Sequence, residues 1–216
     1  MRLLLFLAAV SFSAIVSFLT EFWGSEHAVA ADSFTPERHF PLDRPANLDP
    51  AAAERAYASV ADDMAARFAT SGVPAARHYR RWWRANRSPY LSAEHGSRYV
   101  NTYVNRPARV YGTLPSGQPM PVGSIIAKDA VSVDASGEVL PGALALMEKM
   151  PEGYDEKARD WRYVLILPDG SVFADSSGTN PGGTSFCAIC HATNGEATDH
   201  LFLLPQGVAR RPPPDS

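Results

Sequence analysis

Apolar residues recur at three- and four-residue steps between residues 51 and 69, and this spacing predicts an amphipathic helix with one face against a core. Asp49 stands at the N-cap position and Pro50 at the first helical position, while Gly72 closes the helix. The apolar face consists of Ala53, Tyr57, Val60, Met64 and Phe68.

Residues 75–85 predict a second, shorter helix, which ends before Pro89 because proline disfavours helical backbone in the preceding residue. From residue 98 the pattern changes to alternating β-branched and aromatic residues, which predicts strands. The expected strands lie within residues 98–105, 121–133, 137–150 and 161–174, the last range holding two strands about the turn at residues 168–170. We therefore predict an α+β fold, a mostly antiparallel β-sheet with the N-terminal helices packed against it.

The N-terminus has the pattern of a secretory signal. Met1-Arg2 provides a charged start, an apolar run follows over residues 3–19, and Ala-Val-Ala at residues 28–30 fits the pattern of signal-peptidase cleavage. These features predict a signal peptide over residues 1–31 and export to the periplasm. An uncleaved membrane anchor is the alternative.

The rest of the chain is long enough for one domain with its own core. Proline-rich residues 32–48 predict an extended N-terminal arm, residues 49–205 the domain, and residues 206–216 a flexible tail. The formal net charge of −3 at pH 7 provides no general electrostatic basis for binding nucleic acid or an anionic membrane. Partners must therefore be recognised at a local site.

Both cysteines of the chain lie in the segment Cys187-Ala-Ile-Cys190-His191. Such a pair occurs in disulfide oxidoreductases, zinc sites, structural disulfides and c-type haem proteins. An oxidoreductase carries the pair at a helix start in a βαβ unit, and a zinc site needs further ligands, whereas this motif follows an antiparallel meander and has no second pair. Cys-x-x-Cys-His is the attachment motif of c-type haem. We therefore predict one covalent haem c bound through Cys187 and Cys190, with His191 as the axial iron ligand.

The ligand on the opposite side of the iron is not marked by any sequence context. The candidates are Met64, Met120, Met147, Met150, His39, His78, His95 and His200. Core packing is the expected role of Met64, which lies on the apolar helix face. Lys128 shares a predicted strand face with Ser124 and Ile126, and a solvated lysine is the ordinary alternative to a functional one there.

The segments RYVNTYVN, PVGSIIAKD, DWRYVLI, CAICH and DHLF, in this order over residues 98–204, resemble the cytochrome P460 family, which includes the beta-type cytochromes c prime. The resemblance covers about half the chain, and only the haem motif is specific by itself. It implies an antiparallel sheet with helices against it, a five-coordinate haem c and a distal pocket under the sheet. Lys128 falls at the position of the lysine that cytochrome P460 bonds to a meso carbon of the porphyrin. The cytochromes c prime lack this bond.

The same resemblance implies further residues on the distal side of the haem. It places Arg98 there, where a guanidinium could hydrogen-bond a bound nitrogen oxide, and a cation at the strand edge is the alternative. Hydroxylamine-oxidising members of the family have a distal carboxylate. Glu148, Asp129 and Asp175 are candidates for it on spacing, and the sequence does not choose among them.

Three functions remain open at this point. The first is a periplasmic haem protein of the cytochrome P460 type that oxidises hydroxylamine or nitric oxide and passes electrons to a redox partner cytochrome, with Lys128 and Arg98 in the site. The second is a non-enzymatic cytochrome c prime type protein that binds NO or CO, and the third is a simple electron carrier closed by methionine. Family members often form dimers, so the resemblance also allows a homodimer.

Overall fold

The computed structural model describes residue 42 and residues 44–212. The predicted signal peptide and most of the predicted N-terminal arm lie outside these residues. All described residues belong to one unit of the chain, residues 35–216. Helices long and apolar enough to cross a bilayer are absent from the described residues.

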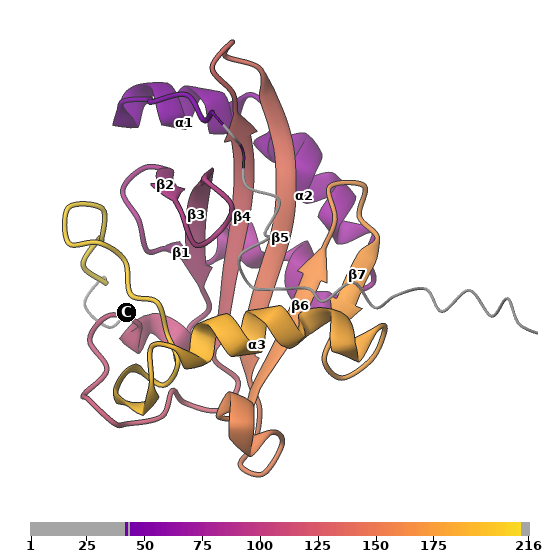
Figure 1. Ribbon diagram of the computed structural model, residues 1–216, viewed down its shortest axis with the longest axis vertical. Coiled ribbons are helices and arrows are strands. Elements are labelled where there is room, and N and C mark those ends of the chain that lie inside the picture. The colour runs from indigo at the N-terminus through magenta and orange to yellow at the C-terminus, as the bar shows by residue number, and fades with distance from the viewer. Residues whose placement is uncertain (1–41, 43, 213–216) are drawn as a thin grey trace, which may run out of the picture. The chain divides into compact units, whose positions relative to one another are not determined.

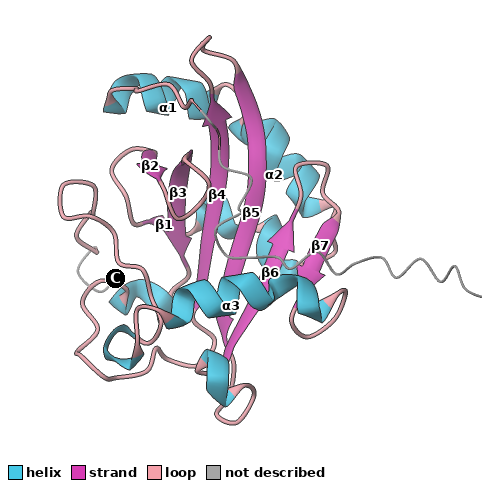
Figure 2. Cartoon of the chain, in the orientation of Figure 1, coloured by secondary structure: helices cyan, strands magenta, loops and turns pink. Residues whose placement is uncertain are grey.

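The domain is built on an antiparallel sheet of seven strands (Figures 1 and 2). Strands β1, β3, β4, β5, β6 and β7 are neighbours in this order, and β2 also pairs with β3. The strands are β1 (Trp83–Arg84), β2 (Tyr90–Ser92), β3 (Arg98–Val104), β4 (Ile125–Val133), β5 (Val139–Lys149), β6 (Trp161–Ile166) and β7 (Val172–Asp175). The predicted α+β fold is confirmed.

The first predicted helix is two helices, α1 (Pro50–Ala58) and α2 (Ala61–Ala69). Asp49 caps α1 as predicted, since its carboxylate accepts a hydrogen bond from the backbone N–H of Ala52 at 2.7 Å. The prediction of one continuous helix is wrong because the Ser59 hydroxyl bonds to the carbonyl of Ala56, and Val60 leaves helical geometry with φ of −127°.

The prediction of a second helix over residues 75–85 is also wrong. It is replaced by two short 3₁₀ helices, η1 (Pro74–Arg77) and η2 (Tyr79–Arg81), followed by β1. Trp83 and Arg84 pair with β3, so tertiary pairing overrides the local helical pattern. In the predicted C-terminal tail, the backbone of residues 208–210 hydrogen-bonds with residues 85 and 87.

The two faces of the sheet are covered by different parts of the chain. The helices α1 and α2 pack against one face, and α3 (Ser185–Ala192) crosses the other, in front of the strands in Figure 1. Adjacent side chains of a strand point to opposite faces. In β4, Ala127 and Val131 therefore belong to the core under the helices, and Ile126 and Ala130 line the α3 side.

A buried carboxylate lies on the helix-covered face. One oxygen of Asp129, Oδ2, accepts hydrogen bonds from the hydroxyls of Tyr57 at 2.7 Å and Tyr79 at 2.9 Å. The side chain of Asp129 is fully buried, and this burial raises its pKa to about 6, although the two hydroxyls act in the opposite direction. Tyr57 also lies 3.0 Å from the hydroxyl of Tyr103, so α1, η2 and the sheet meet at this cluster.

The raised pKa of Asp129 predicts a stability that depends on pH. The unfolded pKa is about 3.9, so between about pH 4 and pH 6 the folded chain binds more protons, and the free energy of unfolding falls as pH rises. We expect the wild type to lose on the order of 2 kcal/mol relative to Asp129→Asn over this window. Urea unfolding at stepped pH measures the difference, with the exposed Asp62→Asn as the control that keeps the wild-type slope. Parallel curves for wild type and Asp129→Asn would contradict this assignment.

Candidate functional site

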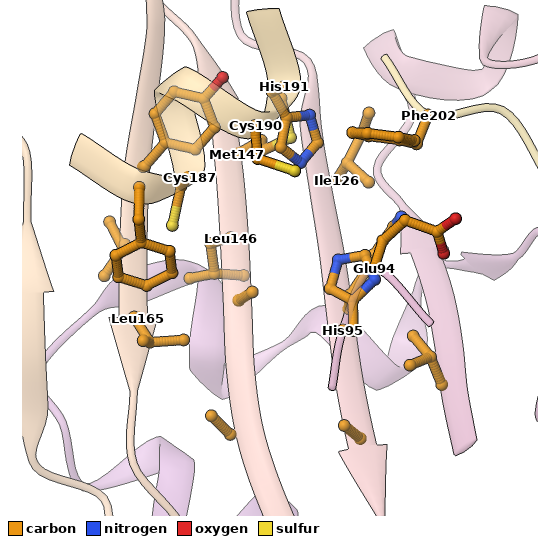
Figure 3. A pocket seen from close by; sticks show the side chains of 18 residues that line it. Glu94, His95, Ile126, Leu146, Met147, Leu165, Cys187, Cys190, His191 and Phe202 are labelled. Carbon is orange, nitrogen blue, oxygen red and sulfur yellow. The ribbon is translucent and has the colours of Figure 1, made fainter. Parts of the chain in front are cut away.

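A pocket lies between α3 and the sheet (Figure 3). Its volume is about 120 Å³, and it is partly open to solvent. Most of its walls are apolar, and they include Val100, Ile126, Ala130, Ala143, Ala145, Met147, Leu165, Phe186 and Phe202. Such walls limit the access of water to anything bound inside.

The helix α3 supplies the chemistry of the predicted haem motif. Cys187, Cys190 and His191 lie three and four positions apart, a spacing that places them on one helix face, and all three line the pocket (Figure 3). Ile189, between the cysteines, has an exposed fraction of 56% and lies outside the pocket lining. The local helix therefore presents both thiols and the imidazole to one cavity.

The two thiols are free of a disulfide bond and are not acidic. Burial raises the pKa of Cys187 to about 12, and burial also raises the pKa of Cys190. A redox-active cysteine pair needs a lowered pKa for the attacking thiolate. These surroundings therefore do not favour the disulfide oxidoreductase alternative.

The imidazole of His191 is buried, and a hydrogen bond at Nδ1 orients the ring. Its Nδ1 lies 2.9 Å from the carbonyl oxygen of His200, and a carbonyl only accepts, so Nδ1 carries the proton and donates. The ring packs edge-on against Phe202, with centroids 5.1 Å apart, and near Tyr163 at 5.6 Å. In this tautomer Nε2 carries no proton, so it is the ring nitrogen that could bind a metal ion.

Lys128 lies on the pocket side of β4, opposite Thr102 of β3 and Ala145 of β5. The side chain is buried, with an exposed fraction of 8%. Within residues 42 and 44–212, its amine makes neither a hydrogen bond nor an ion pair. Burial lowers its pKa to about 8, although Glu94 and Cys190 act in the opposite direction. The side chain lines the pocket, where its amine could contact a bound group.

Arg98 is not among the residues that line this pocket. It is half-buried at the start of β3, where its Nε donates to the hydroxyl of Ser132 at 3.1 Å. Its guanidinium also lies 3.4 Å from the carbonyl of His95 and 3.5 Å from that of Gly96. Arg98 thus braces the loop between β2 and β3.

None of the three carboxylates suggested by spacing lines the pocket. Asp129 faces the helices on the other side of the sheet. Glu148 and Asp175 are both ion-paired with Arg162, at 2.8 Å and 2.6 Å. The buried tyrosine cluster and the Arg162 pairs therefore account for all three acids.

Glu94, which the sequence analysis did not single out, lines the pocket, and so does His95, one of the candidate iron ligands. They come from the loop between β2 and β3, where the Ser92 hydroxyl donates to Glu94 at 3.0 Å and lies 2.8 Å from Nδ1 of His95. Their position depends on β2 folding back onto β3, and β2 was not predicted. Strand β2 has only three residues, Tyr90–Ser92, and its signals in the sequence are Pro89 before it and Gly96 in the following loop.

Some of the methionines and histidines considered for the side of the iron opposite His191 line the pocket, and others do not. Met64 of α2 is fully buried in the core between the helices and the sheet, in agreement with its expected packing role. Met120 is buried in a separate apolar cluster with Tyr111 and Trp161. Met147 and His95 line the pocket. His39 lies outside the described residues, and His200 contacts His191 through its carbonyl.

The donor set fits a c-type haem, because two free thiols, an imidazole with a defined tautomer and an apolar cavity occur together. A zinc ion is less compatible with this part of the chain. Among residues 42 and 44–212, three or more His, Cys, Asp or Glu side chains do not gather closely enough to hold a metal ion.

Comparisons with known proteins add no assignment to this site. Neither the models of known protein families nor the curated protein sequences include a match to this chain.

Proposed function

We propose that this protein binds one haem c in the pocket between α3 and the sheet and acts on a small nitrogenous ligand, hydroxylamine or nitric oxide, at the iron. The observation that carries the proposal is that Cys187, Cys190, His191 and Lys128 line one apolar pocket. When bound, the haem supplies the one-electron chemistry and the metal site for the ligand. The protein residues hold, orient and insulate it.

Each residue of α3 has a distinct role in this proposal. Cys187 and Cys190, which are half-buried and whose thiol pKa values are raised by burial, would form the two thioether bonds that hold haem c. His191 donates its Nδ1 proton to the carbonyl of His200 and binds the iron through Nε2. The apolar walls exclude water and so favour a small ligand over a larger polar one.

Lys128 decides between the two types of protein that the resemblance allows. A nucleophilic amine must be unprotonated, and a pKa of about 8 leaves a substantial neutral fraction near neutral pH. This supports a third covalent bond to haem, as in cytochrome P460. Its formation would break one N–H and one meso C–H bond, release two protons and pass two electrons to an added oxidant such as a peroxide. A cytochrome c prime type protein that only binds NO or CO would use the same apolar walls without this bond.

Glu94 is the carboxylate that we assign to proton transfer, since it lines the pocket at its solvent-exposed side. Oxidation of hydroxylamine releases protons, and a carboxylate at the mouth of the cavity can accept them and pass them to water. Electrons would then leave to a redox partner cytochrome. Export to the periplasm, where haem c is attached, belongs to the same proposal.

The first test is covalent haem attachment. When the wild type is expressed with a cytochrome c maturation system, we expect mass spectrometry to show one covalent haem per chain. A Cys187→Ala, Cys190→Ala double variant should lose it, because both thioethers are removed. Ile189→Ala serves as the control inside the motif, since this side chain is exposed and should not affect attachment. A wild type without haem would refute the proposal. Full retention in the double variant would show a Lys128 tether alone or a wrong motif.

The second test concerns Lys128. We expect a strongly red-shifted Soret band in the ferrous wild type, and Lys128→Arg should abolish this shift while haem stays attached through the cysteines. The reason is that arginine remains protonated and cannot form the bond. Lys157→Arg, an exposed change in η4 (Glu156–Ala158), is the matched control. An unshifted band in the wild type favours gas binding, and a low-spin six-coordinate spectrum would exclude an open iron site and implicate His95 or Met147.

The third test concerns Glu94. Glu94→Gln keeps the shape of the side chain but removes its capacity to accept a proton, so we expect hydroxylamine oxidation to fall by about 100-fold or more. Haem content and NO binding should not change. Glu138→Gln, an exposed carboxylate between β4 and β5, is the control. Wild-type turnover by Glu94→Gln would rule out this residue as the base.

A further inference from the structure

Two consecutive residues beside the proposed iron ligand have unusual backbone geometry. Asp199 has φ of +53° and His200 has φ of +62°, both in the left-handed region, and neither is glycine. Such residues are costly and persist only where the surroundings hold them in place. The surroundings of Asp199 and His200 must therefore stabilise this geometry, and the carbonyl of His200 contacts His191.

The Asp199 carboxylate accepts hydrogen bonds from two side chains and one backbone N–H. Its two carboxylate oxygens lie 2.9 Å from the amine of Lys149, which is also buried. Arg159 Nε donates to one oxygen at 3.0 Å, and the backbone N–H of Met120 donates to the other at 2.8 Å. Asp199 has no exposed surface, so this pairing is desolvated and fixed.

The backbone of the pair is held as well. The indole N–H of Trp161 donates to the carbonyl of Asp199 at 2.9 Å, and the N–H of His200 donates to the carbonyl of Gly195 at 3.1 Å. Both bonds engage the one peptide group that joins Asp199 to His200. The next peptide group, which carries the His200 carbonyl, is held by the N–H of Leu201, which donates to the carbonyl of Thr198 at 3.0 Å. The carbonyl oxygen of His200 is thereby presented to Nδ1 of His191 at 2.9 Å.

We infer that the cluster of Lys149, Asp199 and Arg159 positions the carbonyl of His200 and so sets the orientation and donor strength of His191 toward a haem iron. This inference rests on the proposed function, because it takes His191 as the axial ligand. An acceptor on Nδ1 makes the imidazole a stronger donor at Nε2 and stabilises ferric over ferrous iron. Lys149 and Asp199 are positioning residues, which act through the peptide group of His200.

Lys149 and Asp199 carry opposite charges. Replacing each in turn therefore distinguishes a positioning role from a direct electrostatic effect of their charges on the iron. Asp199→Asn removes a negative charge, and Lys149→Met removes a positive one. If each variant loosens the His200 carbonyl, both raise the haem reduction potential. A field effect alone would raise it in Asp199→Asn and lower it in Lys149→Met.

The test is redox titration of the holoprotein, together with resonance Raman of the ferrous form. We expect both variants to shift toward ferrous iron by at least tenfold, which is about 59 mV for a one-electron couple, and to lower the iron–histidine stretching frequency. Arg159→Gln, partly exposed and of the same charge change, replaces Lys149→Met if that variant does not fold. Arg162→Gln removes an ion-paired cation of β6 that lies outside the pocket lining, and it should change neither quantity.

The outcomes are distinct. Shifts of opposite sign, or an unchanged stretching frequency, would overturn the positioning role while leaving the proposed function intact. A merely structural role would lower the unfolding midpoint without moving the potential or the frequency, and this too would overturn the inference. A wild type that carries no haem would overturn the proposed function, and the inference would fall with it.

Discussion

The alternation of side chains along β4 is the constraint on which the rest of this structure depends. Lys128 and Asp129 are neighbours in sequence, and both are buried, but the pleat of the strand sends them to opposite faces of the sheet. Lys128 and Asp129 are therefore buried by different parts of the chain. The helices α1 and α2 cover the face of Asp129, and α3 with the pocket covers the face of Lys128.

The two faces meet this need in different ways. On the helix side, the hydroxyls of Tyr57 and Tyr79 satisfy one oxygen of the carboxylate from within the protein, and the result is a closed core. On the other side, the described chain provides no direct partner for the amine of Lys128, and the walls around it are mostly apolar. The first arrangement is part of the structural core, whereas the second lines the pocket in which we propose that haem binds.

The proposed site joins two remote parts of the chain. Cys187, Cys190 and His191 come from α3, and Glu94 and His95 come from the loop before β3, about ninety residues earlier. Arg98 does not line the pocket; its guanidinium contacts the carbonyls of His95 and Gly96 in the loop before β3. A residue expected at the ligand thus contributes to the loop that supplies the carboxylate.

The sequence by itself determined the strands β3 to β7, the cap of α1 and the grouping of the cysteines with His191, because these depend on local alternation, capping and helical spacing. It did not determine the break at Val60, the short strands β1 and β2, or which acid lies in the pocket. Those features depend on pairing with β3 and on which sheet face each side chain enters. Asp129, Glu148 and Asp175 were all possible on spacing, and only the tertiary structure showed that tyrosines and Arg162 engage them whereas Glu94 lines the pocket.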